Sequence, residues 1–308
     1  MTLCGRFAPS PSGRMHLGNV YSALLSWLCA RKHGGRWLLR IEDIDRQRCR
    51  REYADQLIDD LLWLGLAWDD TVTYQSERTQ LYVDAFRQLE RRGLVYPCFC
   101  SRADILAARA PHRSDGIVVY SGRCRDMNTA QRDAMLQQRQ PAWRIRVPDT
   151  TTEFTDMHYG LQTCNLAHDC GDFVIRRADG NFAYQLAVVV DDALAHVNQV
   201  VRGNDLMPST HQQLFLYQAL GFPEPQYCHL PMLLSPAGRR LSKRDRDTDM
   251  QWLRSNYSPE QLIGHIAHLC NLIDRDEPIA LVDLLSVFDL RRLPTNDIVS
   301  ANRHSTLS

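Results

Sequence analysis

Hydrophobic and polar positions in the first third of the chain alternate as short strands followed by helices. Residues 4–8 predict a short strand, and HLGNVYSALLSWLCARK at residues 16–32 predicts an apolar helix. RWLLRIED at residues 36–43 predicts a buried strand that ends in acids, and REYADQLIDDLLWLGL at residues 51–66 predicts an amphipathic helix. Strands that alternate with helices of this length predict a parallel sheet.

The pattern changes twice further along the chain. SERTQLYVDAFRQLERRG predicts a helix with Ser76 as N-cap and Gly93 as its end. Residues 95–168 then break into short pieces rich in Cys, Arg, Asp and Gly, which indicates an insertion. Alternation resumes with DFVIRR, FAYQLAVVVDD, VNQVVRG and the helix STHQQLFLYQALG. Near the end, SPEQLIGHIAHLCNLI predicts a helix that begins with a capping box from Ser258 to Gln261.

Charge and cysteine content narrow the class of protein. The 308 residues carry 36 basic and 36 acidic side chains, so any nucleic-acid site must be a local patch. The N-terminus lacks the basic and apolar regions of a signal peptide, and no apolar run is long enough to cross a membrane, so we expect a cytoplasmic protein. A chain of this size with ten cysteines is no small disulfide scaffold, which predicts reduced thiols and metal ligands where they cluster.

GRFAPSPSGRMHLGN, residues 5–19, specifies more than a turn requires. A strand passes into a helix through Pro, Ser and Gly, and His16 falls at the helix start. Helix N-termini expose unpaired N–H groups that bind phosphate, and Gly13 and Gly18 permit a close approach. This stretch predicts a phosphate site, with a Pro-rich turn capped by His16 as the alternative.

Three further parts of the chain carry candidate chemistry. GRRLSKRD at residues 238–245 contains Lys243, one of two lysines in the chain, whose ammonium would grip a triphosphate; the alternative is a solvated charged loop. Cys98, Cys100 and Cys124 offer three thiolates that need a fourth zinc ligand, for which His112 and Asp115 are candidates. CNLAHDC at residues 164–170 is a weaker metal candidate.

Taken together, these motifs resemble a known enzyme family. PSPSGRMHLGN and RRLSKR resemble the two signature motifs of class I aminoacyl-tRNA synthetases, which the family carries on a Rossmann-like domain. RIEDID, YQSER, DFVIRRADGNFAYQLAVVVDD and VVRGNDL are similar to its glutamyl branch. Only residues 247–308 follow the second motif. In this short C-terminal region the chain is similar to truncated members of the family, which attach glutamate to queuosine in the anticodon loop of tRNA(Asp).

The resemblance implies a fold and a division of the chain. We expect an α/β protein with a Rossmann-like parallel sheet, a zinc-containing insertion and a small helical C-terminal region. The expected units are the first half of the catalytic domain (residues 1–94), the insertion (95–168), the second half with the LSKR loop (169–246) and the C-terminal region (247–308).

The resemblance also implies roles for individual residues. His16 and Lys243 would be catalytic and, with Gly18, would bind ATP. Five residues would bind glutamate: Arg6, Ser10, Glu42, Tyr184 and Arg202. Glu42 would hold the α-amino group, while Arg6 and Arg202 would bind carboxylates. The family favours Tyr120 over His112 as the fourth zinc ligand beside Cys98, Cys100 and Cys124.

The expected partners are L-glutamate, ATP with Mg²⁺, a Zn²⁺ ion and tRNA(Asp) carrying queuosine. We expect the protein to be a monomer that does not bind membranes. Three residues depart from the signature motifs, namely Asn19, Arg240 and Arg244. Three other functions stay open. They are a truncated glutamyl-tRNA synthetase that charges a 3′ end, a nucleotidyltransferase acting on a small molecule, and a catalytically silent zinc-containing RNA-binding module.

Overall fold

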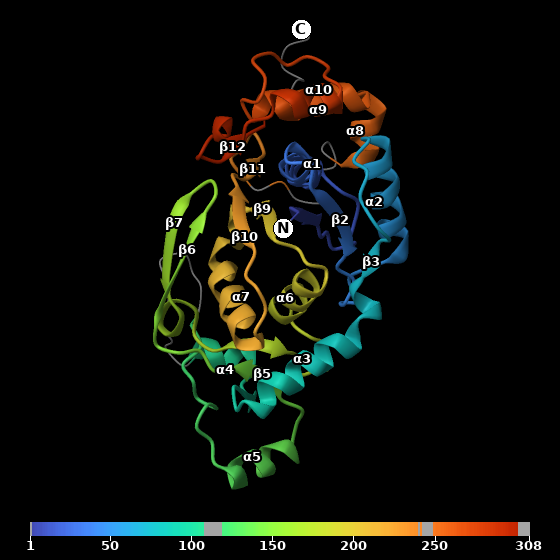
Figure 1. The fold of residues 1–308 in the computed structure, drawn as a ribbon. Helices are drawn as coiled ribbons and strands as arrows, with labels where there is room; N and C mark the ends of the chain where they lie inside the picture. The colour runs from blue at the N-terminus through green and yellow to red at the C-terminus, as the bar shows by residue number, and fades with distance from the viewer. Residues whose placement is uncertain (1, 108–118, 240, 242–248, 301–308) are drawn as a thin grey trace.

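A computed structural model describes residues 2–107, 119–239, 241 and 249–300 of the chain (Figure 1). Lys243, Arg240, Arg244, His112 and Asp115 lie outside the described residues.

A parallel sheet forms the centre of the structure, as the sequence predicts. β1 (Cys4–Phe7) pairs in parallel with β2 (Arg36–Ile41), which pairs in parallel with β3 (Thr73–Tyr74). β9 (Gln199–Gly203) and β10 (Gln226–Leu230) form a second parallel pair. The backbone N–H of Asn198 donates to the Cys4 carbonyl at 3.0 Å, which sets β9 beside β1. The two halves of the sheet, far apart in sequence, therefore meet at β1.

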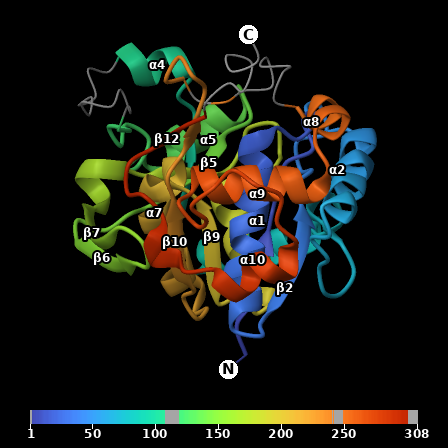
Figure 2. The ribbon, with the colours of Figure 1, turned by 90° about the horizontal axis from the view of Figure 1, so that it is seen from above.

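The helix after β1 is buried on most of its surface. α1 (Leu17–Lys32) packs between the sheet and the C-terminal helices, and Figure 2 shows α9 and α10 lying across it. Leu24, Leu25 and Leu28 are each at most 1% exposed. A helix covered on several sides needs apolar residues all round, which explains its lack of an amphipathic pattern.

Four more helices surround the sheet and its neighbours. They are α2 (Arg51–Trp63), α3 (Thr79–Arg91), α6 (Tyr184–Leu194) and α7 (Met207–Leu220). The prediction of Ser76 as the N-cap of α3 is wrong, because the helix begins three residues later. The Ser76 hydroxyl and N–H both donate to the Asp43 carboxylate, at 2.7 and 2.8 Å, and a short 3₁₀ turn (Gln75–Glu77) occupies the expected start.

The segment between the sheet halves contains its own antiparallel sheet. β5 (Ala142–Ile145) lies between β4 (Val95–Cys98) and β8 (Phe173–Arg176). A hairpin of β6 (Thr151–Asp156) and β7 (Gly160–Asn165) follows. The short helices here are α4 (Arg102–Ala107), α5 (Thr129–Leu136) and a π-helical turn (Leu166–Cys170). The pairing of β8 with β5 links both sides of the expected boundary at residue 168.

The C-terminal region is mainly helical and closes over α1. It contains α8 (Met250–Asn256), α9 (Pro259–Leu269) and α10 (Leu281–Val287). Ser258 and Gln261 form the predicted capping box of α9. A short strand, β12 (Ile298–Val299), pairs in parallel with β11 (Leu233–Leu234), which lies much earlier in the chain.

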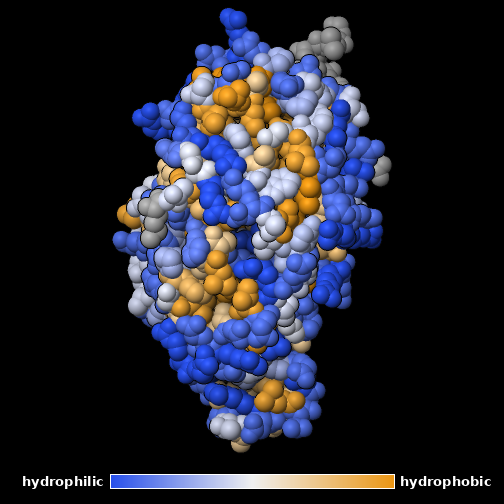
Figure 3. Space-filling model, turned by 45° about the vertical axis from the view of Figure 1, so that its right-hand side comes forward, coloured by the Kyte–Doolittle hydropathy of each residue, from blue (hydrophilic) through white to orange (hydrophobic). Residues whose placement is uncertain are grey.

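The face shown in Figure 3 is mostly hydrophilic, and its apolar residues gather in separate areas. Among the described residues, no helix is both long and apolar enough to span a membrane.

Candidate active site

The loop between β1 and α1 is held by backbone hydrogen bonds from three directions. Glu42 N–H donates to the Pro9 carbonyl at 2.9 Å, and Arg50 N–H donates to the Pro11 carbonyl at 3.0 Å. Met250 N–H, just after residues 242–248, donates to the Met15 carbonyl at 2.9 Å. Donors at the end of β2 and at the starts of α2 and α8 therefore hold the loop in place.

His16 is the N-cap of α1, and this explains two of its neighbours. Its Nδ1 accepts the Gly18 N–H at 3.2 Å, and the Asn19 side chain accepts the His16 N–H at 3.1 Å. A Cβ at Gly18 would lie 3.1 Å from the His16 ring, so glycine makes room for the imidazole. Because Nδ1 accepts, Nε2 carries the ring proton of neutral His16 and is a donor suited to a phosphate oxygen.

One cavity of about 470 Å³ brings together the predicted amino-acid and ATP residues that the structure describes. Seven of them line it: Arg6, Ser10, His16, Gly18, Glu42, Tyr184 and Arg202. Asn19, which departs from the signature motif, lines it too. Leu241 also lines the cavity, and Asp249 forms a β-bridge with His16, so both residues flanking 242–248 lie at this site.

Two cavity residues, Arg6 and Glu42, belong to a buried network of charges that sequence reasoning missed. The Arg6 Nε donates to both carboxylate oxygens of Asp192, at 3.2 and 3.3 Å. Arg40 pairs with the same carboxylate and donates to Glu42 at 3.2 Å. Burial would raise the pKa of Asp192, yet Arg40 and Arg6 hold it below its usual value. Asp192 thus fixes Arg6 by its Nε, and among the described residues nothing binds the terminal nitrogens of Arg6.

Glu42 and Tyr184 contribute polar groups to the same cavity. Burial raises the pKa of Glu42, although Arg40 and Arg6 oppose this shift. Burial also raises the pKa of Tyr184, so its hydroxyl stays protonated and can donate or accept a hydrogen bond. An ammonium ion placed beside Glu42 would favour its charged form.

Arg202 is buried among neutral acceptors. Its Nε donates to His229 Nε2 at 3.2 Å, and Nη1 donates to Gln213 Oε1 at 2.8 Å. Its Nη2 donates to Thr210 Oγ1 at 2.8 Å and weakly to the Leu206 carbonyl at 3.4 Å. Within the described part of the chain, no carboxylate pairs directly with this guanidinium. One Nη1–H therefore remains for an anionic ligand in the cavity.

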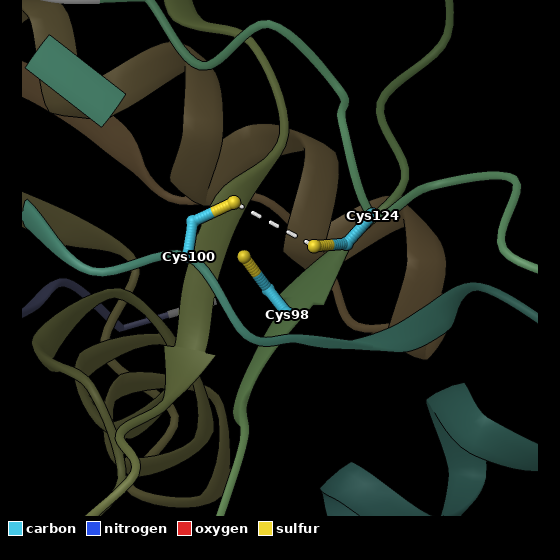
Figure 4. A group of neighbouring side chains, drawn as sticks. All are labelled: Cys98, Cys100 and Cys124. Carbon is cyan, nitrogen blue, oxygen red and sulfur yellow. Dashed lines mark hydrogen bonds between the residues drawn. The ribbon is translucent and has the colours of Figure 1, made fainter. Parts of the chain in front are cut away.

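A second cluster, in the segment between the sheet halves, fits a zinc ion. The sulfurs of Cys98, Cys100 and Cys124 all lie within 4.8 Å of one another and face a common space (Figure 4). The Tyr120 oxygen lies 3.4 Å from the Cys98 sulfur and 3.7 Å from that of Cys100, and the Cys100 and Cys124 sulfurs are 3.6 Å apart. Tetrahedral zinc–sulfur bonds of about 2.3 Å require ligand atoms about 3.8 Å apart. The donor set therefore suits Zn²⁺.

Arg144 supports this cluster and was not foreseen from the sequence. Its Nε donates to the Cys98 sulfur at 3.3 Å, and its guanidinium lies 3.8 Å from the centre of the Tyr120 ring. Burial would raise the pKa of Cys98, but hydrogen bonds with Tyr120, the Cys100 N–H and Arg144 lower it. A lowered pKa favours the thiolate, which is the form that binds metals.

The remaining cysteines follow the sequence expectation. No disulfide joins any of the ten cysteines, all of which lie in the described part of the chain. Of the seven outside the zinc cluster, five are buried, and Cys49 and Cys170 are half-buried. Cys164 and Cys170 approach each other, with sulfurs 3.6 Å apart, but they form no cluster of three or more metal-binding side chains in the described ranges.

Comparisons with known proteins agree with this architecture. The family model for the catalytic domain of class I (E and Q) tRNA synthetases matches residues 2–293. The chain is 48% identical to the glutamyl-Q tRNA(Asp) synthetase of Symbiobacterium thermophilum, over 96% of this chain and 95% of the relative. It is 45% identical to that of a Neisseria meningitidis strain, over 96% of this chain and 99% of the relative.

A solved structure supports the fold independently. The crystal structure of a glutamate tRNA ligase from Elizabethkingia meningosepticum, in complex with its amino acid, matches with a TM-score of 0.84 and 28% identity. The match covers 98% of this chain and 67% of the ligase. The chain is thus a class I tRNA synthetase-like ligase and belongs to the glutamyl-Q tRNA(Asp) synthetase family.

Proposed function

We propose that the protein activates L-glutamate with ATP and transfers it to queuosine in the anticodon loop of tRNA(Asp). The observation that carries this proposal is the single cavity in which Arg6, Glu42 and Arg202 converge beside the start of α1. Two cations and one carboxylate match the two carboxylates and the ammonium of glutamate. The printed names of the relatives support the choice of acceptor.

Activation requires two substrates to meet in this cavity. The glutamate α-carboxylate attacks the α-phosphorus of ATP, which forms glutamyl-adenylate and releases pyrophosphate. We assign the amino group to Glu42 and the carboxylates to Arg6 and Arg202, with Ser10 and Tyr184 completing the glutamate site. The His16 Nε2–H and the α1 N-terminus would stabilise phosphate charge, with Lys243 in the role implied by the sequence. Magnesium would accompany ATP.

Transfer then uses a nucleophile from the RNA. A hydroxyl of queuosine attacks the activated carbonyl, forms an ester and releases AMP. The protein contributes position and charge rather than a covalent intermediate.

We further propose that Cys98, Cys100, Tyr120 and Cys124 hold a structural zinc ion. With four protein ligands the site would be closed, so the metal would link β4 to the residues around Cys124 rather than take part in the reaction. Arg144 would orient Cys98 from outside the ligand set.

Replacing Cys124 with serine should lower zinc affinity by more than about 100-fold, because losing even an outer partner of a ligand costs about 10–100-fold. Tyr120→Phe, which removes only the oxygen, should also weaken binding. Competition with a chromophoric chelator measures the affinity. Cys164→Ser, a buried cysteine in the same segment, should bind zinc as the wild type does. Unchanged affinity in the Cys124 variant would contradict the site.

The acceptor can be identified directly. Labelled glutamate, ATP and total tRNA are incubated with the protein, and the labelled nucleotide is then located by nuclease digestion. We expect label on the anticodon-loop fragment that contains queuosine, and none with tRNA from cells unable to make queuosine. Label on the 3′-terminal adenosine would instead identify a truncated glutamyl-tRNA synthetase. A wild-type protein without glutamate-dependent ATP–pyrophosphate exchange would overturn the enzymatic assignment.

A further inference from the structure

Arg202 lies at the end of a buried hydrogen-bond chain that begins outside the parallel sheet. Its Nε donates to His229 Nε2 on β10, and His229 Nδ1 lies 2.7 Å from Asp156 Oδ2. The side chains of Asp156 and His229 are both 0% exposed. Asp156 ends β6, so the hairpin between the sheet halves reaches the amino-acid cavity through two side chains.

The contacts of Asp156 make it an acceptor of fixed orientation. Its Oδ1 accepts the N–H groups of His158 and Tyr159, at 3.0 and 2.9 Å, and its Oδ2 accepts the His229 N–H at 3.0 Å. Burial would raise the pKa of Asp156, but these donors and His229 lower it, so the carboxylate stays charged. Met157 N–H donates to the Tyr227 carbonyl at 2.8 Å, which fixes the hairpin to β10.

The charge state of His229 determines which of its nitrogens can face Arg202. Burial, together with the nearby Arg202 charge, lowers the pKa of His229 and keeps the ring neutral. A neutral imidazole has one donor and one acceptor nitrogen. Because Nδ1 faces a carboxylate, Nδ1 carries the proton and Nε2 is left to accept from Arg202. Thr210 Oγ1, 3.2 Å from Nε2, can donate to the same nitrogen.

We propose that Asp156 and His229 are positioning residues for glutamate binding: Asp156 fixes the tautomer of His229, and His229 holds the Arg202 guanidinium toward a substrate carboxylate. This inference rests on the proposed role of Arg202. It assigns part of the amino-acid site to the β6–β7 hairpin, whose residues do not line the cavity themselves.

Two substitutions at His229 separate positioning from packing. The glutamine amide in His229→Gln reaches about as far as Nε2 and can accept from Arg202. The shorter amide in His229→Asn replaces Nδ1 and can donate to Asp156, but it leaves Arg202 Nε without its acceptor. Both changes remove the ring, and Asn leaves a gap about one methylene larger than Gln does, so the melting temperature of each variant is measured beside its KM.

In ATP–pyrophosphate exchange, His229→Asn should raise the KM for glutamate about tenfold, the size expected for one hydrogen bond to a charged group. His229→Gln should raise it less than about threefold, and both variants should keep the KM for ATP within about twofold. Equal increases in the two variants, or a matching rise in the KM for ATP, would overturn the inference.

Asp156→Asn tests the tautomer itself. With its oxygen bound to the turn N–H groups, the new amide would donate toward His229 Nδ1 and favour the tautomer with Nε2–H facing Arg202. We expect the side-chain ¹⁵N spectrum of His229 to change tautomer and the KM for glutamate to rise about tenfold. An unchanged tautomer with unchanged KM would refute the role of Asp156.

Arg202→Ala, measured in parallel, separates the proposed role of Arg202 from the positioning role of Asp156 and His229. If it leaves the KM for glutamate unchanged, the proposed role of Arg202 fails. If it raises that KM while His229→Asn and Asp156→Asn do not, only the positioning inference fails.

Discussion

Replacing Arg202 with alanine should lower kcat/KM for glutamate in ATP–pyrophosphate exchange by about 100-fold or more. The variant removes a buried cation that keeps an N–H for a ligand and contacts only neutral acceptors among the described residues. A hydrogen bond between charged groups contributes up to about 3 kcal/mol, and 1.4 kcal/mol corresponds to tenfold. Arg202→Lys should recover part of the loss, because it restores charge without the planar fork.

The KM for ATP and the melting temperature are the controls for this experiment. Arg87→Ala, at an exposed position on α3, should behave as the wild type. A loss of glutamate activation below about threefold in a folded Arg202→Ala protein would show that another residue binds the substrate carboxylate.

Replacing Asp192 with asparagine should lower the free energy of unfolding by about 3–5 kcal/mol. Removing one partner of a buried ion pair leaves the other uncompensated. Here Arg6 would lose its carboxylate, and Arg40 would keep only Glu42 and Asp191. Denaturant titration measures the change. Asp55→Asn, which removes an exposed pair with Arg51, should cost less than about 1 kcal/mol.

The same pair gives a defined pH dependence. The folded-state pKa of Asp192 is lowered, so its contribution to stability is present above its unfolded pKa of about 3.9 and is lost as pH falls through the lower folded value. The Asp192→Asn protein should lack this component. Equal stability of the two proteins at neutral pH would show that the network can rearrange around a missing charge.

Much of the fold could be predicted because the pattern is local. Strands β1 and β2, helix α2 and the capping box of α9 follow from spacing and capping residues alone. The start of α3 could not be predicted in this way, because Asp43, 33 positions earlier, binds Ser76. Competition for a hydroxyl by a distant carboxylate leaves no trace in the local sequence.

The residues of the site likewise divide into those that local motifs predict and those that depend on distant partners. Every residue predicted to bind glutamate lines the cavity. The residues predicted to bind zinc lie together, namely Cys98, Cys100, Tyr120 and Cys124. Asp192, Arg40, Asp156, His229 and Arg144 escaped notice because their function depends on a partner remote in sequence. A signal existed for Asp192, since acidic pairs are rare in a Val-rich helix, but its partners could not be read from it.

The buried network of Arg6, Arg40, Glu42 and Asp192 also affects which substitutions the protein can accept. Asp192 pairs with Arg6 and Arg40, and Arg40 pairs with Glu42. A substitution at Asp192 therefore leaves Arg6 without its carboxylate, and one at Arg40 leaves Glu42 without its cation. Arg202 contacts neutral groups, so its loss strands no other charge. Selection for a different amino acid would therefore meet fewer charge constraints at position 202 than at positions 40 and 192.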